Sequence, residues 1–178
     1  ALPGLSDIPV LGPILFKQRR HAWNNSEFFI YKFRTMRWEP DSAKAAAGVI
    51  QQTLRDDPRI TKLGNILRKT SIDELPQLFN VLQGDMSLVG PRPHAVNMRT
   101  EEQLGHEIVD TYSHRHRVKP GITGWAQVNG SRGATDTVEQ LRRRVELDLY
   151  YVENWSLWLD IKILFMTGLT VVRGNNAY

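Results

Sequence analysis

The clearest pattern along the chain is a short run of apolar residues at helical spacing. Four of them stand at positions i, i+3, i+4 and i+7: Leu75, Leu78, Phe79 and Leu82. Gly84 follows, where a helix of this length would stop. The spacing therefore predicts an amphipathic helix with one apolar face. Pro76 would cost a backbone hydrogen bond inside the first turns, so we expect the helix to begin late, with Asp73 or Leu75 near its cap.

Weaker patterns predict the remaining elements. Two β-leaning runs, 14–18 and 28–33, flank Asn24-Asn25-Ser26 and predict a hairpin. Helices are expected over three further segments: 60–68, 101–114 and 137–153. An Ala-rich stretch between Arg37 and Asp56 has helix propensity without a clear apolar face. Together these patterns predict an α+β fold: a helix-dominated single globular domain with a small β-hairpin.

The segment 155–172 is mostly apolar, with Asp160 and Lys162 near its start. Trp155 and Trp158 stand at one end, and indole rings favour the boundary between membrane and water. An amphipathic helix along a bilayer surface and an ordinary core helix both fit this content. No apolar run reaches the ~18 residues of a spanning helix. We expect an interfacial helix, with Trp155 and Trp158 at the membrane interface.

Composition narrows the class of partner. The chain has 178 residues, 41% of them hydrophobic, which suits one domain over 1–178 with a real core. Lys and Arg number 23 against 19 Asp and Glu, and the net charge of +4 favours phosphate-bearing partners such as nucleic acid, nucleotides or an anionic bilayer. The absence of Cys excludes disulfides, Cys-based zinc sites and thiol nucleophiles, and it is compatible with the cytoplasm.

Two adjacent carboxylates, Asp73 and Glu74, stand near the start of the central helix, with two cations just before them. A helix N-terminus keeps a carboxylate ionised and attracts phosphate, and an ionised Asp is a usable nucleophile toward phosphorus. A purely structural alternative exists, because Ser71 followed by Glu74 matches a capping box. Pro76 weakens that alternative without excluding it.

Several cations elsewhere in the sequence could bind phosphate. Lys32 and Arg34 stand two apart on a presumed strand and project to the same side, where they could hold a diphosphate. Arg92 lies between Pro91 and Pro93. Its guanidinium is therefore expected on a stiff, extended loop that suits bidentate contact with phosphate.

Other motifs bear on other kinds of chemistry. His114 and His116 could share one face of a strand as metal ligands, but no further His or Cys completes a set nearby. The alternating cations Arg115, Arg117 and Lys119 are interpreted as a solvated or phosphate-facing edge. No Walker loop or dinucleotide fingerprint is present, so kinase-like and Rossmann functions lose their main support.

Six separated motifs cover nearly the whole chain: Tyr31 to Met36, Asp57 to Thr61, Thr70 to Gln77, Gly84 to Pro93, Lys119 to Gly130 and Leu147 to Trp158. In their order they resemble the bacterial sugar transferase family, the monotopic polyprenyl-phosphate hexose-1-phosphate transferases. The resemblance implies a catalytic domain on the cytoplasmic face of the bacterial inner membrane, with UDP-hexose and undecaprenyl phosphate as substrates. In the family a hydrophobic re-entrant segment precedes Gly12 to Phe16, so residues 1–16 are expected to be its tail.

The resemblance also implies a mechanism. Asp73 would attack the β-phosphate of the UDP-sugar, release UMP and form a phosphoglycosyl aspartate, which polyprenyl phosphate then displaces in a ping-pong reaction. Glu74 would bind Mg²⁺, a hard cation that suits phosphoryl transfer. Substrate- and phosphate-binding positions of the family match six residues: Lys32, Arg34, Arg68, Pro91, Arg92 and Pro93.

Two further motifs, Arg92 to Val96 and Arg132 to Thr137, resemble the subgroup that starts exopolysaccharide or capsule repeat units with glucose-1-phosphate. Galactose-1-phosphate is the alternative, because one hydroxyl epimer is decided by pocket contacts that no linear motif exposes. The segment 21–26 departs from the family, which usually carries glycines there.

Two non-enzymatic alternatives also fit parts of the sequence. A basic nucleic-acid-binding module would use the Arg clusters, but recognised motifs and interleaved stacking aromatics are missing, so we expect no nucleic-acid partner. A peripheral membrane scaffold would use only the apolar face of 155–172. A homo-oligomer is compatible with the sequence.

Overall fold

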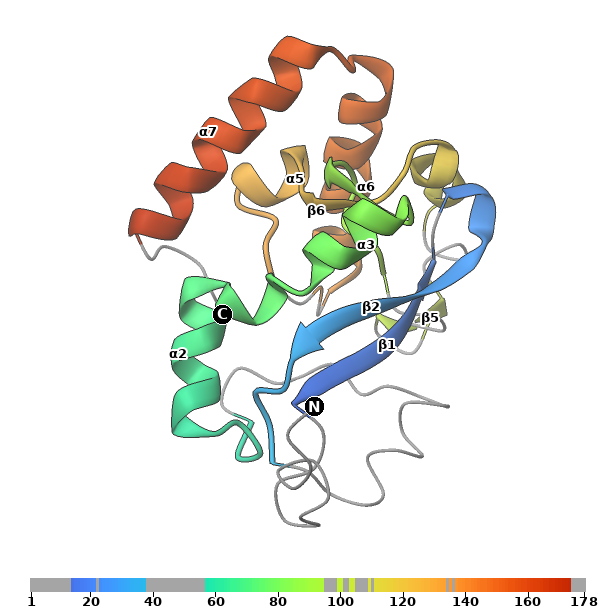
Figure 1. Ribbon diagram of the computed structural model, residues 1–178. Helices are drawn as coiled ribbons and strands as arrows, with labels where there is room; N and C mark the ends of the chain where they lie inside the picture. Colours follow the sequence, from blue (N-terminus) through green and yellow to red (C-terminus); the bar gives the residue numbers. More distant parts are fainter. Residues whose placement is uncertain are drawn as a thin grey trace.

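The computed structural model of the protein describes residues 14–21, 23–37, 57–94, 99–100, 103–104, 109, 111–133, 135 and 137–173. Helices dominate this part of the chain, and its strands pair into three two-stranded sheets (Figure 1). The expected helix-dominated α+β fold is confirmed. The Ala-rich stretch between Arg37 and Asp57 and most of the expected membrane tail, residues 1–13, lie outside the described residues.

The predicted hairpin is present and longer than expected. Strands β1 (Leu15–His21) and β2 (Glu27–Phe33) pair antiparallel from Leu15 opposite Phe33 to His21 opposite Glu27. The short 3₁₀-helix η1 (Trp23–Asn25) joins them, with Asn24 at φ 56°. Asn tolerates this left-handed conformation better than most residues, so the turn forms here without a glycine.

Helix α2 (Lys62–Thr70) confirms the helix predicted near 60–68. Thr61 caps it, since its side chain accepts a hydrogen bond from the backbone N–H of Gly64 at 2.9 Å. Gly64 is required by close packing, because a Cβ there would lie 1.9 Å from the carbonyl oxygen of Thr35. The helix therefore lies tightly against the segment that follows β2.

The central helix exists, but its orientation differs from the simplest expectation. Helix α3 (Gln77–Gln83) ends at Gly84, which adopts φ 84°, as predicted. Its apolar residues are exposed, Leu82 by 83%, whereas its buried residues are Gln77 and Asn80. Asn80 is buried because its amide serves strand β2: it accepts from the backbone N–H of Tyr31 at 3.2 Å and donates to the carbonyl of Phe29 at 2.8 Å.

Strands β3 (Ser87–Val89) and β6 (Gly121–Thr123) pair in parallel and adjoin the proline-rich segment. A Cβ on Gly121 would lie 2.1 Å from the backbone nitrogen of Gly90, so the two segments approach closely at this point. The N–H of Gly121 also donates to the carbonyl of Pro91 at 3.0 Å. The sheet thus places the Pro91 to Pro93 segment.

Two long helices complete the fold: α6 (Val138–Glu153) and α7 (Leu157–Arg173). The short helix α5 (Trp125–Val128) contacts both, and α7 also packs against β3 and β6. A buried cluster of Val89, Tyr151 and Ile163 lies where these elements meet. Helices α6 and α7 begin close to the predicted positions.

Two predictions around residue 110 are wrong. The segment expected as helix 101–114 includes a strand, β5 (Gln103–Leu104), paired with β4 (Arg99–Thr100). The segment Tyr112–Arg117 is a 3₁₀-helix, η3, and not a strand. Of the three cations interpreted as a solvated edge, Arg117 and Lys119 are exposed, but Arg115 is not. Arg115 in particular is 1% exposed, because it forms an ion pair with Asp148 of α6.

Helix α7 has the apolar character expected of the segment 155–172. Within the described residues, no helix reaches the combination of length and hydropathy that a membrane crossing requires. Trp155 is 60% exposed and Trp158 is 80% exposed, so neither indole belongs to the core. Contact of these rings with a bilayer stays a prediction.

Candidate active site

Asp73 and Glu74 lie on a 3₁₀ turn, η2 (Ile72–Glu74), between helices α2 and α3. Ser71 ends α2 in the left-handed region, at φ 59° and ψ 17°, and so turns the chain from one helix to the next. The Ser71 side chain makes no capping bond, and the side chain of Glu74 bonds to cations. The capping-box alternative is therefore wrong. The capping box in the described part of the chain lies instead at the start of α6, on Thr137 and Gln140.

Glu74 is held by two cations from distant segments. Lys32 on β2 donates from Nζ to Oε1 at 2.8 Å. Arg92 donates to both oxygens, through Nη1 to Oε2 at 3.1 Å and through Nη2 to Oε1. Burial opposes ionisation of Glu74, but the charges of Arg92 and Lys32 outweigh it and hold the pKa of the carboxyl well below its usual range.

Asp73 has the opposite environment. It is 7% exposed, and no described residue donates a hydrogen bond to its carboxylate. Burial and the neighbouring charge of Glu74 raise its pKa, against the charges of Lys32, Arg68 and Arg92. Neighbouring carboxylates whose pKa values are shifted apart are typical of sites where one group reacts and the other stays charged.

The expected stiffness of the Arg92 segment is confirmed by the partners of its carbonyl groups. Each of the three carbonyls accepts a bond from a different part of the chain: Pro91 from the N–H of Gly121, Arg92 from Arg115 at 2.8 Å, and Pro93 from Arg20 at 3.4 Å. Pro91 and Pro93 are buried, and Arg92 is only partly exposed. Its guanidinium is therefore held in place before any ligand arrives.

Arg115 is itself fixed by a buried ion pair. Its Nη2 lies 2.5 Å from Oδ2 of Asp148, and both side chains are almost fully buried. Burial lowers the pKa of Arg115, but the charge of Asp148 outweighs it and raises that pKa overall. Burial raises the pKa of Asp148 against the opposing charge of Arg115. The ion pair fixes the guanidinium of Arg115, whose Nη2 also donates to the carbonyl of Arg92.

The two other predicted cations lie differently. Arg68, at the end of α2, donates from Nε to Oγ1 of Thr35 at 2.8 Å, and its charge acts on Asp73. Arg34 follows β2, and its Nη1 is buried without a hydrogen-bond partner among the described residues. The structure thus brings Lys32, Arg68 and Arg92 to the carboxylates, and it shows no hydrogen bond from Arg34 to either.

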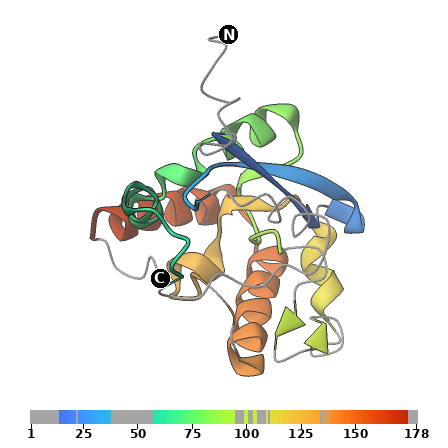
Figure 2. The same ribbon diagram turned by 90° about the horizontal axis from the view of Figure 1, so that it is seen from below.

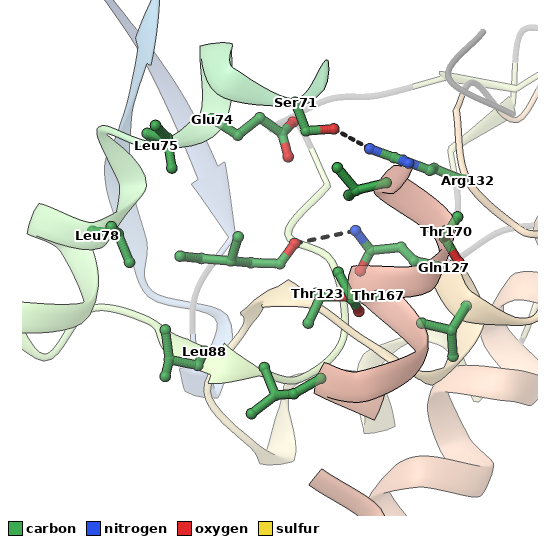
Figure 3. Close-up of a pocket in the computed structure, with 14 residues that line it drawn as sticks. Ser71, Glu74, Leu75, Leu78, Leu88, Thr123, Gln127, Arg132, Thr167 and Thr170 are labelled. Carbon is green, nitrogen blue, oxygen red and sulfur yellow. Dashed lines mark hydrogen bonds between the residues drawn. The ribbon is translucent and has the colours of Figure 1, made fainter. Parts of the chain in front are cut away.

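A cavity of about 210 Å³ opens beside Glu74 (Figure 3). Its walls are mostly apolar: Leu75, Leu78, Leu88, Ile122, Val128 and Leu164. Its polar end is formed by Glu74, Ser71 and Arg132, and the guanidinium of Arg132 donates to the Ser71 hydroxyl. We call this space the apolar cavity.

Sequence reasoning missed Arg132 as a site residue. It lies 61 residues from Ser71 and stands in a loop, so neither spacing nor helical periodicity could connect the two. The loop is fixed by Arg144 of α6, which is buried and donates to the carbonyls of Ser131 at 2.9 Å and Gly133 at 2.8 Å. Arg144 itself stood within an Arg triplet that gave no sign of which member points inward.

The donor set is compatible with Mg²⁺. This ion binds through one or two carboxylates together with substrate phosphates and waters. Asp73 accepts no hydrogen bond from the described residues, and Glu74 Oε2 accepts one, whereas a carboxylate oxygen can accept two. Within the described residues no group of three His, Cys, Asp or Glu side chains gathers as a metal site, so substrate phosphates and waters would have to complete the coordination here.

Comparison with known proteins identifies the family. The chain is 54% identical to the undecaprenyl-phosphate glucose phosphotransferase of Komagataeibacter xylinus over 167 residues, which are 94% of this chain and 31% of that protein. It is 50% identical to the UDP-glucose:undecaprenyl-phosphate glucose-1-phosphate transferase of Escherichia coli K12 over 168 residues, 94% of this chain and 34% of that protein.

A third relative has a different substrate in its name. The UDP-N-acetylgalactosamine-undecaprenyl-phosphate N-acetylgalactosaminephosphotransferase of Aeromonas hydrophila is 45% identical over 93% of this chain and 37% of its own length. The chain thus spans about a third of the length of these relatives. The family model described as bacterial sugar transferase matches residues 5–174, and the chain therefore belongs to the bacterial sugar transferase family.

Proposed function

We propose that the protein transfers hexose-1-phosphate from a UDP-hexose to undecaprenyl phosphate and releases UMP. The observation that carries the proposal is Asp73: a buried carboxylate to which no residue in the described part of the chain donates a hydrogen bond, beside a Glu74 that Lys32 and Arg92 hold in place. Three cations act on it, which is the environment that an anionic diphosphate needs. The names of the relatives support the same substrates.

The first step forms a covalent intermediate. An oxygen of Asp73 attacks the β-phosphorus of the UDP-sugar, and the bond from that phosphorus to the oxygen bridging the α-phosphate breaks. The electron pair leaves with UMP, and the sugar phosphate stays on Asp73 as an acyl phosphate ester. Because none of the described side chains or N–H groups donates to Asp73, its lone pairs are available for attack.

The second step regenerates the carboxylate. A phosphate oxygen of undecaprenyl phosphate attacks the same phosphorus, and the bond to Asp73 breaks. The products are the lipid diphosphate sugar and a free Asp73 carboxylate. Arg92 and Lys32 both form ion pairs with Glu74 in the resting state, which holds the two cations beside the site of transfer.

Mg²⁺ bound by Glu74 together with substrate phosphates would neutralise charge as the phosphoryl group moves. The chain's own residues supply the rest. Arg92, on its fixed segment, orients the carboxylate that would hold the metal, and Arg68 adds positive charge on the Asp73 side. Burial of the site favours these electrostatic interactions because water screens them less.

The sugar is proposed to be glucose. Two of the three relatives described above act on glucose according to their names, and one acts on N-acetylgalactosamine. Exopolysaccharide or capsule assembly is the corresponding process, with the transfer as its first membrane step. Galactose-1-phosphate is the alternative donor group.

We place the domain on the cytoplasmic face of the bacterial inner membrane. Large apolar side chains are exposed on three helices: Leu63 and Ile66 on α2, Phe79 and Leu82 on α3, and Trp158 and Phe165 on α7. Helices α2 and α7 lie on the same side of the molecule in two perpendicular views (Figures 1 and 2). Exposed apolar side chains in such number favour an interaction surface, and a lipid bilayer suits them.

The test is UMP release. Asp73→Asn should abolish UMP formation from UDP-glucose and undecaprenyl phosphate, because an amide cannot displace UMP. Glu139→Gln, which removes one carboxylate from the exposed face of α6, is the matched control and should retain activity. Full activity of the Asp73→Asn variant would refute the mechanism. Turnover of UDP-galactose in preference to UDP-glucose would refute the choice of sugar.

A further inference from the structure

The apolar cavity beside Glu74 combines two chemistries at opposite ends. Leu75, Leu78 and Leu88 form apolar walls and are each about half exposed, so the cavity opens toward the surface. At the other end lie Arg132 and the hydroxyl of Ser71. A ligand that fits both ends must carry a hydrocarbon part and an anionic head.

The polar side chains in the walls do not change this character. The hydroxyl of Thr170 donates to the carbonyl of Met166 at 2.8 Å, and that of Thr167 donates to the carbonyl of Ile163 at 2.8 Å. Their hydrogen-bonding capacity is thus largely used within α7. The side-chain amide of Gln127 donates to the carbonyl of Ile122 at 3.1 Å, and its Oε1 is a buried acceptor without a hydrogen-bond partner among the described residues. A nucleotide base or ribose would find few donors here.

The size of the cavity limits how much of a ligand it takes. Its volume of about 210 Å³ is below the ~300 Å³ at which pockets begin to enclose a drug-sized molecule. It therefore takes one end of a longer molecule, and the rest must continue outside. The helices that line the cavity carry further exposed apolar side chains, Leu82 on α3 and Phe165 on α7. These helices therefore also offer apolar surface to a hydrocarbon chain outside the cavity.

The charges at the polar end favour an anion. Glu74 borders the cavity, but its negative charge is compensated by Lys32 and Arg92. Arg132 has the uncharged Ser71 hydroxyl as its hydrogen-bond acceptor, so its positive charge can serve a ligand. The loop that carries it is fixed by Arg144, which means that Arg132 is positioned in advance.

We propose that the apolar cavity binds the phosphate end of the lipid acceptor, with Arg132 contacting the phosphate and the leucine walls holding the first isoprene units. This inference rests on the proposed function and extends it by assigning the acceptor to a site of its own. Glu74 borders the cavity and adjoins Asp73 in the chain, so a phosphate held by Arg132 shares the cavity with one member of the dyad.

The inference can be tested by binding, without turnover. The full chain in nanodiscs of zwitterionic lipid is titrated with farnesyl phosphate, with farnesol and inorganic phosphate as single-part probes and empty nanodiscs as blank. Farnesyl phosphate should bind more tightly than either part alone. Arg132→Gln should weaken it roughly tenfold, because a charge-assisted bond is lost. Arg143→Gln, the same change on the exposed face of α6, is the matched control and should bind like wild type.

A second pair of variants tests the apolar walls. Val128→Trp fills the cavity from α5, and Leu88→Trp narrows its mouth from β3, where partial exposure makes the fold tolerant of the change. Either folded variant should lose farnesyl phosphate binding. Unchanged binding in Arg132→Gln, or in a folded variant of the pair, would overturn the inference. The inference would also be overturned if wild-type protein bound farnesyl phosphate no more tightly than farnesol. The same holds if UDP-glucose alone displaced bound farnesyl phosphate.

Kinetics then separate this inference from the function on which it rests. Arg132→Gln should raise the KM for undecaprenyl phosphate about tenfold and change the KM for UDP-glucose less than twofold. A raised KM for UDP-glucose alone would assign Arg132 to the donor and overturn the inference. Wild-type protein that binds farnesyl phosphate but releases no UMP would instead refute the proposed function and leave the lipid-phosphate site standing.

Discussion

Helices α3 and α6 both bury polar side chains, but they do so for different reasons. In α6 the buried face mixes apolar Leu141 and Val145 with Arg144 and Asp148, and it belongs to the core. In α3 the buried face is polar, with Gln77 and Asn80, and the apolar residues point outward. Helical periodicity thus identifies both helices, but the buried side of α3 is decided by hydrogen bonds to β2 and not by hydrophobicity.

The two helices also have different roles in the structure. Helix α6 stabilises the surroundings of the site through two buried side chains. Asp148 forms an ion pair with Arg115, which bonds to the Arg92 carbonyl, and Arg144 donates hydrogen bonds to the loop that carries Arg132. Helix α3 presents apolar side chains to the outside while its buried amides keep η2 next to β2. Helix α6 therefore contributes to the stability of the core, whereas the apolar face of α3 stays exposed. The comparison can be tested by substitutions on each side.

The largest effect is expected from Asp148→Ala. Removing this carboxylate leaves Arg115 charged, buried and uncompensated, which should cost about 3–5 kcal/mol in the free energy of unfolding. Urea denaturation measures this cost. Glu146→Ala, an exposed carboxylate on the same helix, should lie within about 0.5 kcal/mol of wild type. Equal effects of the two substitutions would mean that the buried pair does not support the fold.

A matched leucine pair compares the two helices directly. Leu141 of α6 is fully buried, so Leu141→Ala should destabilise the protein by about 2–4 kcal/mol through lost burial and a cavity. Leu82 of α3 is 83% exposed, so Leu82→Ala should change stability by less than about 0.5 kcal/mol. The same urea experiment on the protein outside a membrane gives both values. A large loss in the Leu82→Ala variant would show that the face of α3 is covered in solution.

A smaller loss in the free energy of unfolding is expected when the hydrogen bonds that orient α3 are removed. Asn80→Ala leaves the N–H of Tyr31 and the carbonyl of Phe29 without their partner, at a cost of about 1–3 kcal/mol. Hydrogen exchange should then rise at the amide of Tyr31 more than at amides in α6. Unchanged protection at Tyr31 would mean that Asn80 does not decide the orientation of α3.

The smallest expected effects are those of pH on the two carboxylates, and they differ in sign. The pKa of Asp73 is raised in the folded protein, so its ionisation opposes folding as pH rises through that pKa. Asp73→Asn should therefore be more stable than wild type near pH 7 and converge with it under acid conditions. Lower stability of the variant at pH 7 would contradict the raised pKa.

Glu74 should behave in the opposite way. Its pKa is held below the ordinary value of 4.5, so it stabilises the fold above that pH, and this contribution is lost as pH falls through the lowered pKa. Glu74→Gln should be less stable than wild type at pH 7, with the gap closing in acid. Thermal unfolding of both variants across pH 2–8 measures the two signs. For activity, the acid limb should lie above the ordinary Asp range, because Asp73 must be ionised to attack.

The sequence predicts those parts of the molecule that local rules control. The hairpin, helices α2, α3, α6 and α7 and the stop at Gly84 follow from spacing and turn residues. The stiff position of Arg92 follows from its two prolines. The meeting of Lys32, Glu74 and Arg92 was expected only from a family resemblance, because 42 and 18 residues of chain separate these partners.

Three features could not be read from the sequence. Arg115 stands in a basic run that has the composition of a solvated edge, and only its pairing with Asp148, 33 residues away, explains its burial. Ser71 takes a left-handed conformation for which sequence rules favour glycine. The outward face of α3 contradicts the usual use of hydrophobic periodicity, since tertiary hydrogen bonds outweigh it.

The carbonyl partners of the Pro91 to Pro93 segment tie the position of Arg92 to the completeness of the fold. Gly121, Arg115 and Arg20 reach the segment from a sheet, a 3₁₀-helix and the hairpin, all distant along the chain. Alignment of the Arg92 guanidinium therefore depends on contacts that form only between distant parts of the chain. Under the proposed function, a nascent or truncated domain that lacks one of these contacts would be largely folded and still chemically silent.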